Sequence, residues 1–139
     1  MRIVTLIILW TVRVAGIVQL TLGALFWAGT AISFIPLHIR IGYLIVLCLW
    51  TMATVALVTR VGGGLAIFAL LWGIALPAVG LQQAMILVGP MHWIIRVIHL
   101  LMGLTALGLA DRLAGRVLAS TSAAEGKGAS PLAASIRSR

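Results

Sequence analysis

The sequence predicts an all-α protein, an integral membrane four-helix bundle with both termini in the cytoplasm. Of its 139 residues, 63% are hydrophobic and only 9% are charged, and the mean hydropathy of +1.22 lies far outside the usual balance of a soluble domain. The apolar runs reach the roughly 20 residues that a helix needs to cross a bilayer core of about 30 Å. The alternation with period two that marks a membrane barrel is absent. We therefore expect a multi-pass membrane protein.

The apolar runs divide the chain into a membrane domain and a tail. We expect one domain over residues 1–116, with spans at about 3–28, 38–59, 64–84 and 90–110. The short basic start resembles a signal peptide, but Arg13 interrupts the apolar run and no small-residue cleavage site follows. The first run is therefore expected to be an uncleaved span.

Basic residues near the span ends predict the orientation, because loops rich in Lys and Arg stay in the cytoplasm. With four spans, one side of the membrane receives Arg2, Arg60, Arg112, Arg116, Lys127, Arg137 and Arg139. Only Arg40 lies close to the opposite surface. The net charge of +8 is spread over span ends and tail, which favours contact with the lipid bilayer and argues against nucleic acid as a partner.

Two further expectations concern the cytoplasmic side. Residues 117–139 are rich in Ala, Ser and Gly and show no apolar period, so we expect a flexible basic cytoplasmic tail. Arg13, inside the first span, lies about 24 Å from the outer surface, and Asp111 lies about 32 Å from it on the fourth span. Because a long arginine side chain can bridge that gap, we predict that Arg13 pairs with Asp111 or lies near it.

Polar side chains interrupt the fourth span in the segment GPMHWIIRVIHLLMG, residues 89–103. At about 100° per residue, His92, Arg96, His99 and Gly103 fall within an arc of about 60° and form one stripe. Ionisable groups inside a membrane are costly and usually face the bundle interior or a wet cavity. The alternative is structural, with neutral histidines bonded to other helices and Arg96 reaching for the outer headgroups.

A b-type haem would explain this stripe together with the start of the second span. His38 enters the membrane from the same side and at the same depth as His92, so these two are the expected axial ligands. His99 replaces one of them only if the helices slide or tilt. Arg40 and Arg96 would neutralise the haem propionates.

Three segments carry a resemblance to known proteins. FWAGTAISFIPLHIRIG, LLWGIALPAVGLQQ and GPMHWIIRVIHLLMG resemble a group of small uncharacterised bacterial four-span membrane proteins, over most of residues 13–112. That group has no established activity to transfer, but the resemblance implies a multi-pass protein of a bacterial cytoplasmic (inner) membrane. A looser resemblance to four-helix membrane cytochromes b is carried by His38, His92 and His99, and implies a haem b electron carrier.

Three functions follow from these patterns. The first is a haem b electron-transfer protein or subunit with its site near the outer face, with a quinone near Gln82 and Trp93 as its redox partner. The second is a non-catalytic accessory subunit, in contact with other membrane subunits or with a second copy of the chain. The third is a small transporter, which the lack of a carboxylate deep in the membrane disfavours. No Ser/His/Asp spacing and no H-E-x-x-H motif occurs, so we name no catalytic residue and do not expect an independent hydrolase.

Overall fold

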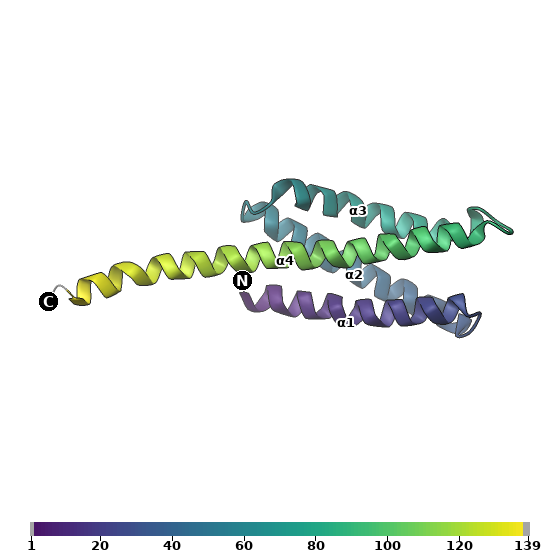
Figure 1. The fold of residues 1–139 in the computed structure, drawn as a ribbon, viewed down its shortest axis with the longest axis horizontal. Coiled ribbons are helices and arrows are strands. Elements are labelled where there is room, and N and C mark those ends of the chain that lie inside the picture. The colour runs from purple at the N-terminus through teal and green to yellow at the C-terminus, as the bar shows by residue number, and fades with distance from the viewer. Residues whose placement is uncertain (1, 138–139) are drawn as a thin grey trace.

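The computed structural model describes the backbone of residues 2–137 and the side chains up to residue 124. Four long helices follow one another, namely α1 (Arg2–Trp27), α2 (Ile35–Val58), α3 (Gly63–Gln82) and α4 (His92–Arg137), with single 3₁₀ turns at Ile32–Phe34 and Gln83–Met85. The described part of the chain contains no strand. Figure 1 shows the helices side by side as a bundle, with α4 running far beyond the other three. The all-α prediction is confirmed.

All four helices are long and apolar enough to cross a membrane, which suggests a multi-pass membrane protein. Three of them match the expected spans to within a few residues. The exception is α4, which was expected to end its span near residue 110 and instead continues as helix to Arg137. Leu113, Ala114 and Val117 are buried, so packing extends the helix past the expected end. Residues 117–137 are helical where we expected irregular chain, residues 138–139 lie outside the described part, and the flexibility of the tail remains a prediction.

The connections between helices lie at two ends of the bundle. The distal end carries the α1–α2 and α3–α4 connections, residues 28–34 and 83–91, and the proximal end carries the start of α1 and the α2–α3 turn at residues 59–62. At the distal end, Gly29 has a φ of 74° and closes α1 with a bond from its N–H to the Phe26 carbonyl. Only glycine adopts this backbone conformation at little cost. Pro36 then stands in the first turn of α2, where its missing N–H is not needed.

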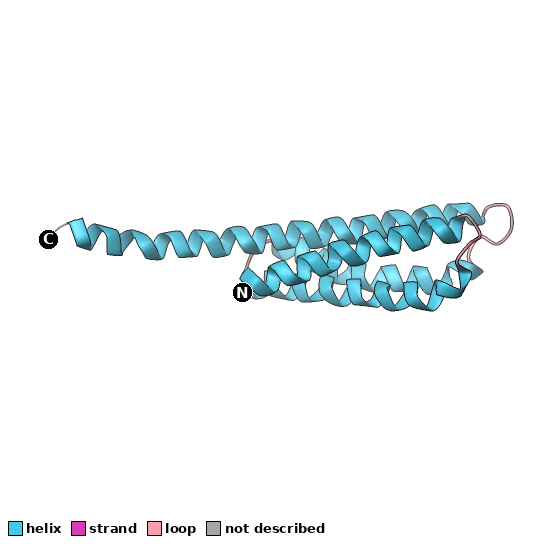
Figure 2. Cartoon of the chain, turned by 90° about the horizontal axis from the view of Figure 1, so that it is seen from below, coloured by secondary structure: helices cyan, strands magenta, loops and turns pink. Residues whose placement is uncertain are grey.

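The packing order of the helices places α2 and α4 in the middle of the bundle. Each of these two helices packs against all three others, whereas α1 and α3 lie on opposite sides of them. Figure 2 shows the same bundle from below, with the helices nearly parallel along its length. Side chains on the facing sides of α2 and α4 therefore meet inside the bundle.

The tightest core lies in the middle and proximal part of the bundle. The side chains with at most 1% exposure are Leu49, Met52, Ala53, Ala56, Ala66, Ala69, Ala106, Ala110, Leu113, Ala114 and Val117. Most of them are alanines, which let helices approach closely, as is typical where lipid removes the hydrophobic drive for helix association. Towards the distal end, buried apolar side chains such as Leu22, Leu76 and Ile95 keep 5 to 9% of their surface exposed.

One predicted contact crosses the surface between α1 and α4. The Arg13 Nε lies 3.1 Å from Asp111 Oδ1, and both side chains are 46% exposed. The Arg13 guanidinium also stands 5.3 Å from the centre of the Trp10 ring. The predicted pairing of Arg13 with Asp111 is confirmed, and it lies about 16 Å along α1 from the start of that helix.

Candidate functional site

Two histidines meet between the central helices at the distal end. His38 lies in the first turn of α2, His99 lies about 10 Å along α4 from its start, and their ring centroids are 6.4 Å apart with an angle of 52° between the planes. Both side chains are half-buried. The structure thus brings one histidine from each central helix into a single site.

The neighbouring helices, α1 and α3, flank this histidine pair on two sides. The Phe26 ring of α1 stands edge-on to His38, with centroids 5.3 Å apart and planes at 69°. On the α3 side, a Cβ added to Gly80 would lie only 2.8 Å from His99 Cε1. Any side chain at position 80 would therefore displace the His99 ring.

Three polar atoms in this region are buried and have no hydrogen-bond partner in the structure, namely Gln19 Oε1, His38 Nδ1 and His99 Nδ1. Gln19 belongs to the same region because its Nε2 lies 3.1 Å from where a Cβ of Gly42 would be, and Gly42 is one helical turn from His38. Leaving such a group unpaired costs about 1–3 kcal/mol. Three orphaned atoms from three helices in one region favour a functional reason for their presence.

Two glycines at the level of the histidine pair have open space beside them. A Cβ added to Gly103, one turn beyond His99 on α4, would meet no atom within 4 Å, and the same holds for Gly23 on α1. Because α1 and α2 are antiparallel and Gln19 lies opposite Gly42, Gly23 lies level with His38. In the sequence, each histidine is followed by glycine at the fourth position, as H-x-x-x-G, with Gly42 after His38 and Gly103 after His99. This repeated pattern is a signal that could have drawn attention to the pair.

His92, the expected partner of His38, lies elsewhere. Its Nδ1 is 3.3 Å from the Ile86 carbonyl oxygen in the α3–α4 connection. The expectation of equal depth assumed that α2 begins near residue 38 and α4 near residue 90. Instead α2 begins at Ile35 and α4 begins at His92. His38 therefore lies at the end of the first turn of α2, whereas His92 is the first residue of α4. The α3–α4 connection also projects farther than the α1–α2 connection (Figure 1). His99, the alternative ligand, is therefore the histidine that meets His38.

The two arginines at this end are both exposed, and they differ in their relation to the histidine pair. Arg40 follows His38 by two residues, about 200° around the helix, and so lies on the opposite side of α2. Arg96 precedes His99 by three residues and lies about one turn nearer the distal end on a similar face. Of the two, only Arg96 is placed where it could contact a group that projects from the pair.

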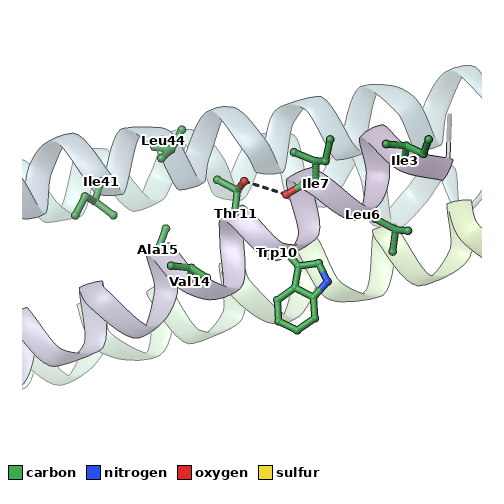
Figure 3. A pocket seen from close by; sticks show the side chains of 9 residues that line it. All are labelled: Ile3, Leu6, Ile7, Trp10, Thr11, Val14, Ala15, Ile41 and Leu44. Carbon is green, nitrogen blue, oxygen red and sulfur yellow. Dashed lines mark hydrogen bonds between the residues drawn. The ribbon is translucent and has the colours of Figure 1, made fainter.

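Two hollows on the surface lie outside the histidine pair. The smaller, of about 500 Å³, is at the distal end and is lined by His92, Trp93 and Arg96 of α4 with residues of the α3–α4 connection. Gln82, expected beside Trp93, is not among the lining residues. The larger, of about 880 Å³, runs along α1 and is closed on one side by Ile41 and Leu44 of α2. Figure 3 shows that its walls are apolar, and that its one hydroxyl, on Thr11, is bonded to the Ile7 carbonyl at 2.9 Å.

Several residues that shape the site were not predicted from the sequence. Gln19 was not a candidate, and neither were Phe26, Gly42 or Gly80. Their roles depend on which helix faces which. Among the described residues, no group of three or more His, Cys, Asp or Glu side chains could hold a metal ion.

Comparisons of the chain with protein-family models, with curated proteins and with solved structures find no match. The function is therefore argued from the geometry of the site.

Proposed function

We propose that the protein is a membrane electron carrier that binds haem b between α2 and α4, with His38 and His99 as the axial ligands. The observation that carries the proposal is the facing pair of half-buried imidazoles, 6.4 Å apart between ring centroids, each with an orphaned Nδ1. Imidazole is a common haem ligand, and bundle interiors are common haem sites. The ligand pair differs from the expected His38 and His92.

The separation of the rings supports one metal centre between them. A metal–nitrogen bond of about 2 Å on each side, added to an imidazole radius of about 1 Å, brings two opposed ring centres to about 6 Å. A bare ion would find only these two ligands, because the described residues offer no third. A porphyrin supplies four nitrogens of its own, so two histidines complete its iron.

The surroundings of the pair also suit a flat ligand. Gly103, one turn from His99, and Gly23, level with His38, both have open space beside them, and small residues of this kind permit close approach of a ligand to the backbone. Arg96 is the arginine placed to neutralise a propionate. When bound, the haem supplies one-electron redox chemistry, while the chain orients the imidazoles and excludes water from them.

The test is a visible spectrum of the full-length protein purified from haem-supplied cells. We expect a Soret band and a sharp reduced α band, both lost in His38→Ala and in His99→Ala and retained in the matched control His92→Ala. His99→Met adds a readout that does not need loss of haem, since a thioether ligand should shift the reduced α band. A wild type without Soret absorbance despite haem supply would contradict the proposal, as would full haem content in both alanine variants.

A second function, as an accessory subunit in the membrane, is supported by the Arg13–Asp111 pair. This ion pair is half exposed on the α1–α4 surface at a depth where lipid contact is costly. A helix of another subunit, or of a second copy, would cover it. Native mass spectrometry of gently extracted protein tests this: we expect a complex that the Arg13→Leu/Asp111→Leu double variant loses, whereas a wild-type monomer would argue against it.

A further inference from the structure

The small hollow at the distal end is separate from the histidine pair. It has a volume of about 500 Å³, within the range of roughly 300–1,000 Å³ that is typical of small-molecule sites. Val88 and Pro90 supply apolar wall, while His92, Trp93 and Arg96 supply the polar atoms. His92 lies about 10 Å along α4 from His99, so the hollow is the surface site next to the proposed haem.

The hydrogen bond of His92 determines what its other ring nitrogen can do. The Ile86 carbonyl oxygen, 3.3 Å from Nδ1, can only accept, so Nδ1 carries the proton of this bond. In the neutral imidazole, Nε2 is then a lone-pair acceptor. His92 therefore brings a hydrogen-bond acceptor and base to the hollow.

The other polar side chains of the hollow can only donate. The Arg96 guanidinium and the Trp93 indole N–H have no acceptor capacity. Among the side chains that the structure describes, the one acidic group is Asp111, and it bonds to Arg13 rather than to Arg96. The hollow thus combines one acceptor with donors, between apolar walls.

This combination favours one class of ligand over an anion. A carboxylate has no hydrogen to donate to the Nε2 acceptor of a neutral His92. A ligand with a hydroxyl and a second oxygen acceptor matches both kinds of group. Exposed apolar side chains surround the hollow, including Met85 at 78% exposure and Val88 at 74%, which suits a ligand that arrives through the lipid.

We propose that this hollow binds a membrane quinol. His92 Nε2 accepts the hydrogen bond, and then the proton, of one hydroxyl, while Arg96 donates to an oxygen of the ring. The Trp93 indole covers the apolar face of the ligand.

The redox step rests on the proposed haem function, although binding itself does not. When bound between His38 and His99, haem would supply a one-electron acceptor. His92 Nε2 would take up the proton of the hydroxyl bonded to it and pass it to the aqueous side, and the proton of the second hydroxyl would leave directly to water. Oxidation of one quinol to quinone releases two protons and two electrons, and so needs two one-electron transfers.

The binding experiment uses the full-length protein in phosphatidylcholine nanodiscs and a short-chain ubiquinol analogue, kept reduced and titrated by calorimetry. We expect saturable binding, weakened at least about tenfold by His92→Leu or by Arg96→Gln, because each change removes a hydrogen bond to the ligand. Arg40→Gln is the matched control, since it removes an arginine of the same end that lies on the other side of α2. Its affinity should be unchanged.

The outcomes separate this inference from the haem proposal. His38→Ala should lose haem and still bind the quinol analogue, so haem-free wild type with intact binding would reject only the haem site. Unchanged affinity in both His92→Leu and Arg96→Gln would overturn the quinol site. Equal weakening by Arg40→Gln, or displacement of the analogue by added phosphatidylglycerol, would also overturn it and indicate a general or anionic-lipid site instead.

Discussion

The proximal and distal halves of the bundle are packed differently. Around Leu49 and Leu113, both with 0% exposure, α2 and α4 are held together by alanines and tightly packed aliphatic side chains. Around His38 and His99, three polar atoms of α1, α2 and α4 are buried without a partner among the described residues, and Gly23 and Gly103 have open space beside them. A chain under selection for stability alone would have little reason to keep polar groups there, because filling the distal half with aliphatic side chains would remove an unpaired-group cost of about 1–3 kcal/mol per atom.

The contrast teaches that the same helices are packed for stability along one part of their length and hold the proposed site along another. The tight proximal core stabilises a fold whose distal half keeps imidazoles without partners. Four experiments test this difference, beginning with the one expected to have the largest effect.

Leu49→Ala should lower the free energy of unfolding by about 2–5 kcal/mol, because Leu49 is fully buried and its truncation leaves a cavity that the packed alanines cannot fill. Reversible unfolding in mixed detergent micelles measures the change. Leu47→Ala is the control, since Leu47 lies on the same helix with 57% of its surface exposed. Similar losses for the two variants would refute the tight proximal core.

A glycine-to-alanine pair compares a tightly packed and an open position at similar depth in the bundle, since Trp72 Nε1 donates to the Met102 carbonyl at 3.0 Å. A Cβ at Gly73 would collide with the Trp50 indole, which donates to the Leu70 carbonyl at 3.1 Å, so Gly73→Ala should destabilise the protein by about 1–3 kcal/mol. Gly103→Ala meets open space and should be neutral or stabilising by up to about 1 kcal/mol in the haem-free protein. Thermal unfolding of both variants would disprove the contrast if Gly103→Ala were the more damaging.

His99→Leu tests the cost of the orphaned atoms directly. In protein prepared without haem, replacing a partnerless imidazole by an aliphatic side chain of similar volume should stabilise the fold by about 1–2 kcal/mol. His92→Leu, which removes the 3.3 Å contact with the Ile86 carbonyl, should not stabilise it. A destabilised His99→Leu variant, measured by the same unfolding assay, would mean that His99 has a structural partner after all.

The smallest effect is expected for the ion pair between the halves. A double-mutant cycle of Arg13→Gln and Asp111→Asn should give a coupling energy of about 0.6 kcal/mol, because the pair is half exposed and polar contacts between membrane helices average that value. A coupling near zero would show that the 3.1 Å contact contributes nothing to stability. A value of several kcal/mol would indicate a pair shielded by another helix.

The sequence by itself determined the helical class and the approximate position of all four apolar helices, because about 20 consecutive apolar residues permit few other structures. It also placed Arg13 near Asp111, since rise per residue alone sets their levels. The same argument predicted His38 beside His92, and there it depended on where each helix begins. Hydropathy does not encode the loops and helix ends. It therefore does not show that the α3–α4 connection projects beyond the α1–α2 connection, or that α2 starts at Ile35, about one turn before His38.

The identity of the neighbours was decided only by the tertiary structure. Helical period places Gln19, Gly42 and Gly80 on faces of their own helices, but it does not say which helix each face meets. Packing of α2 against α4 in the centre of the bundle turns His38 towards His99. Packing of α1 against α2 brings Gln19 to Gly42, and packing of α3 against α4 brings Gly80 to the His99 ring. Such a choice results from the fit of many small side chains along the whole interface, because close approach at the alanines of the core sets the register of the distal half.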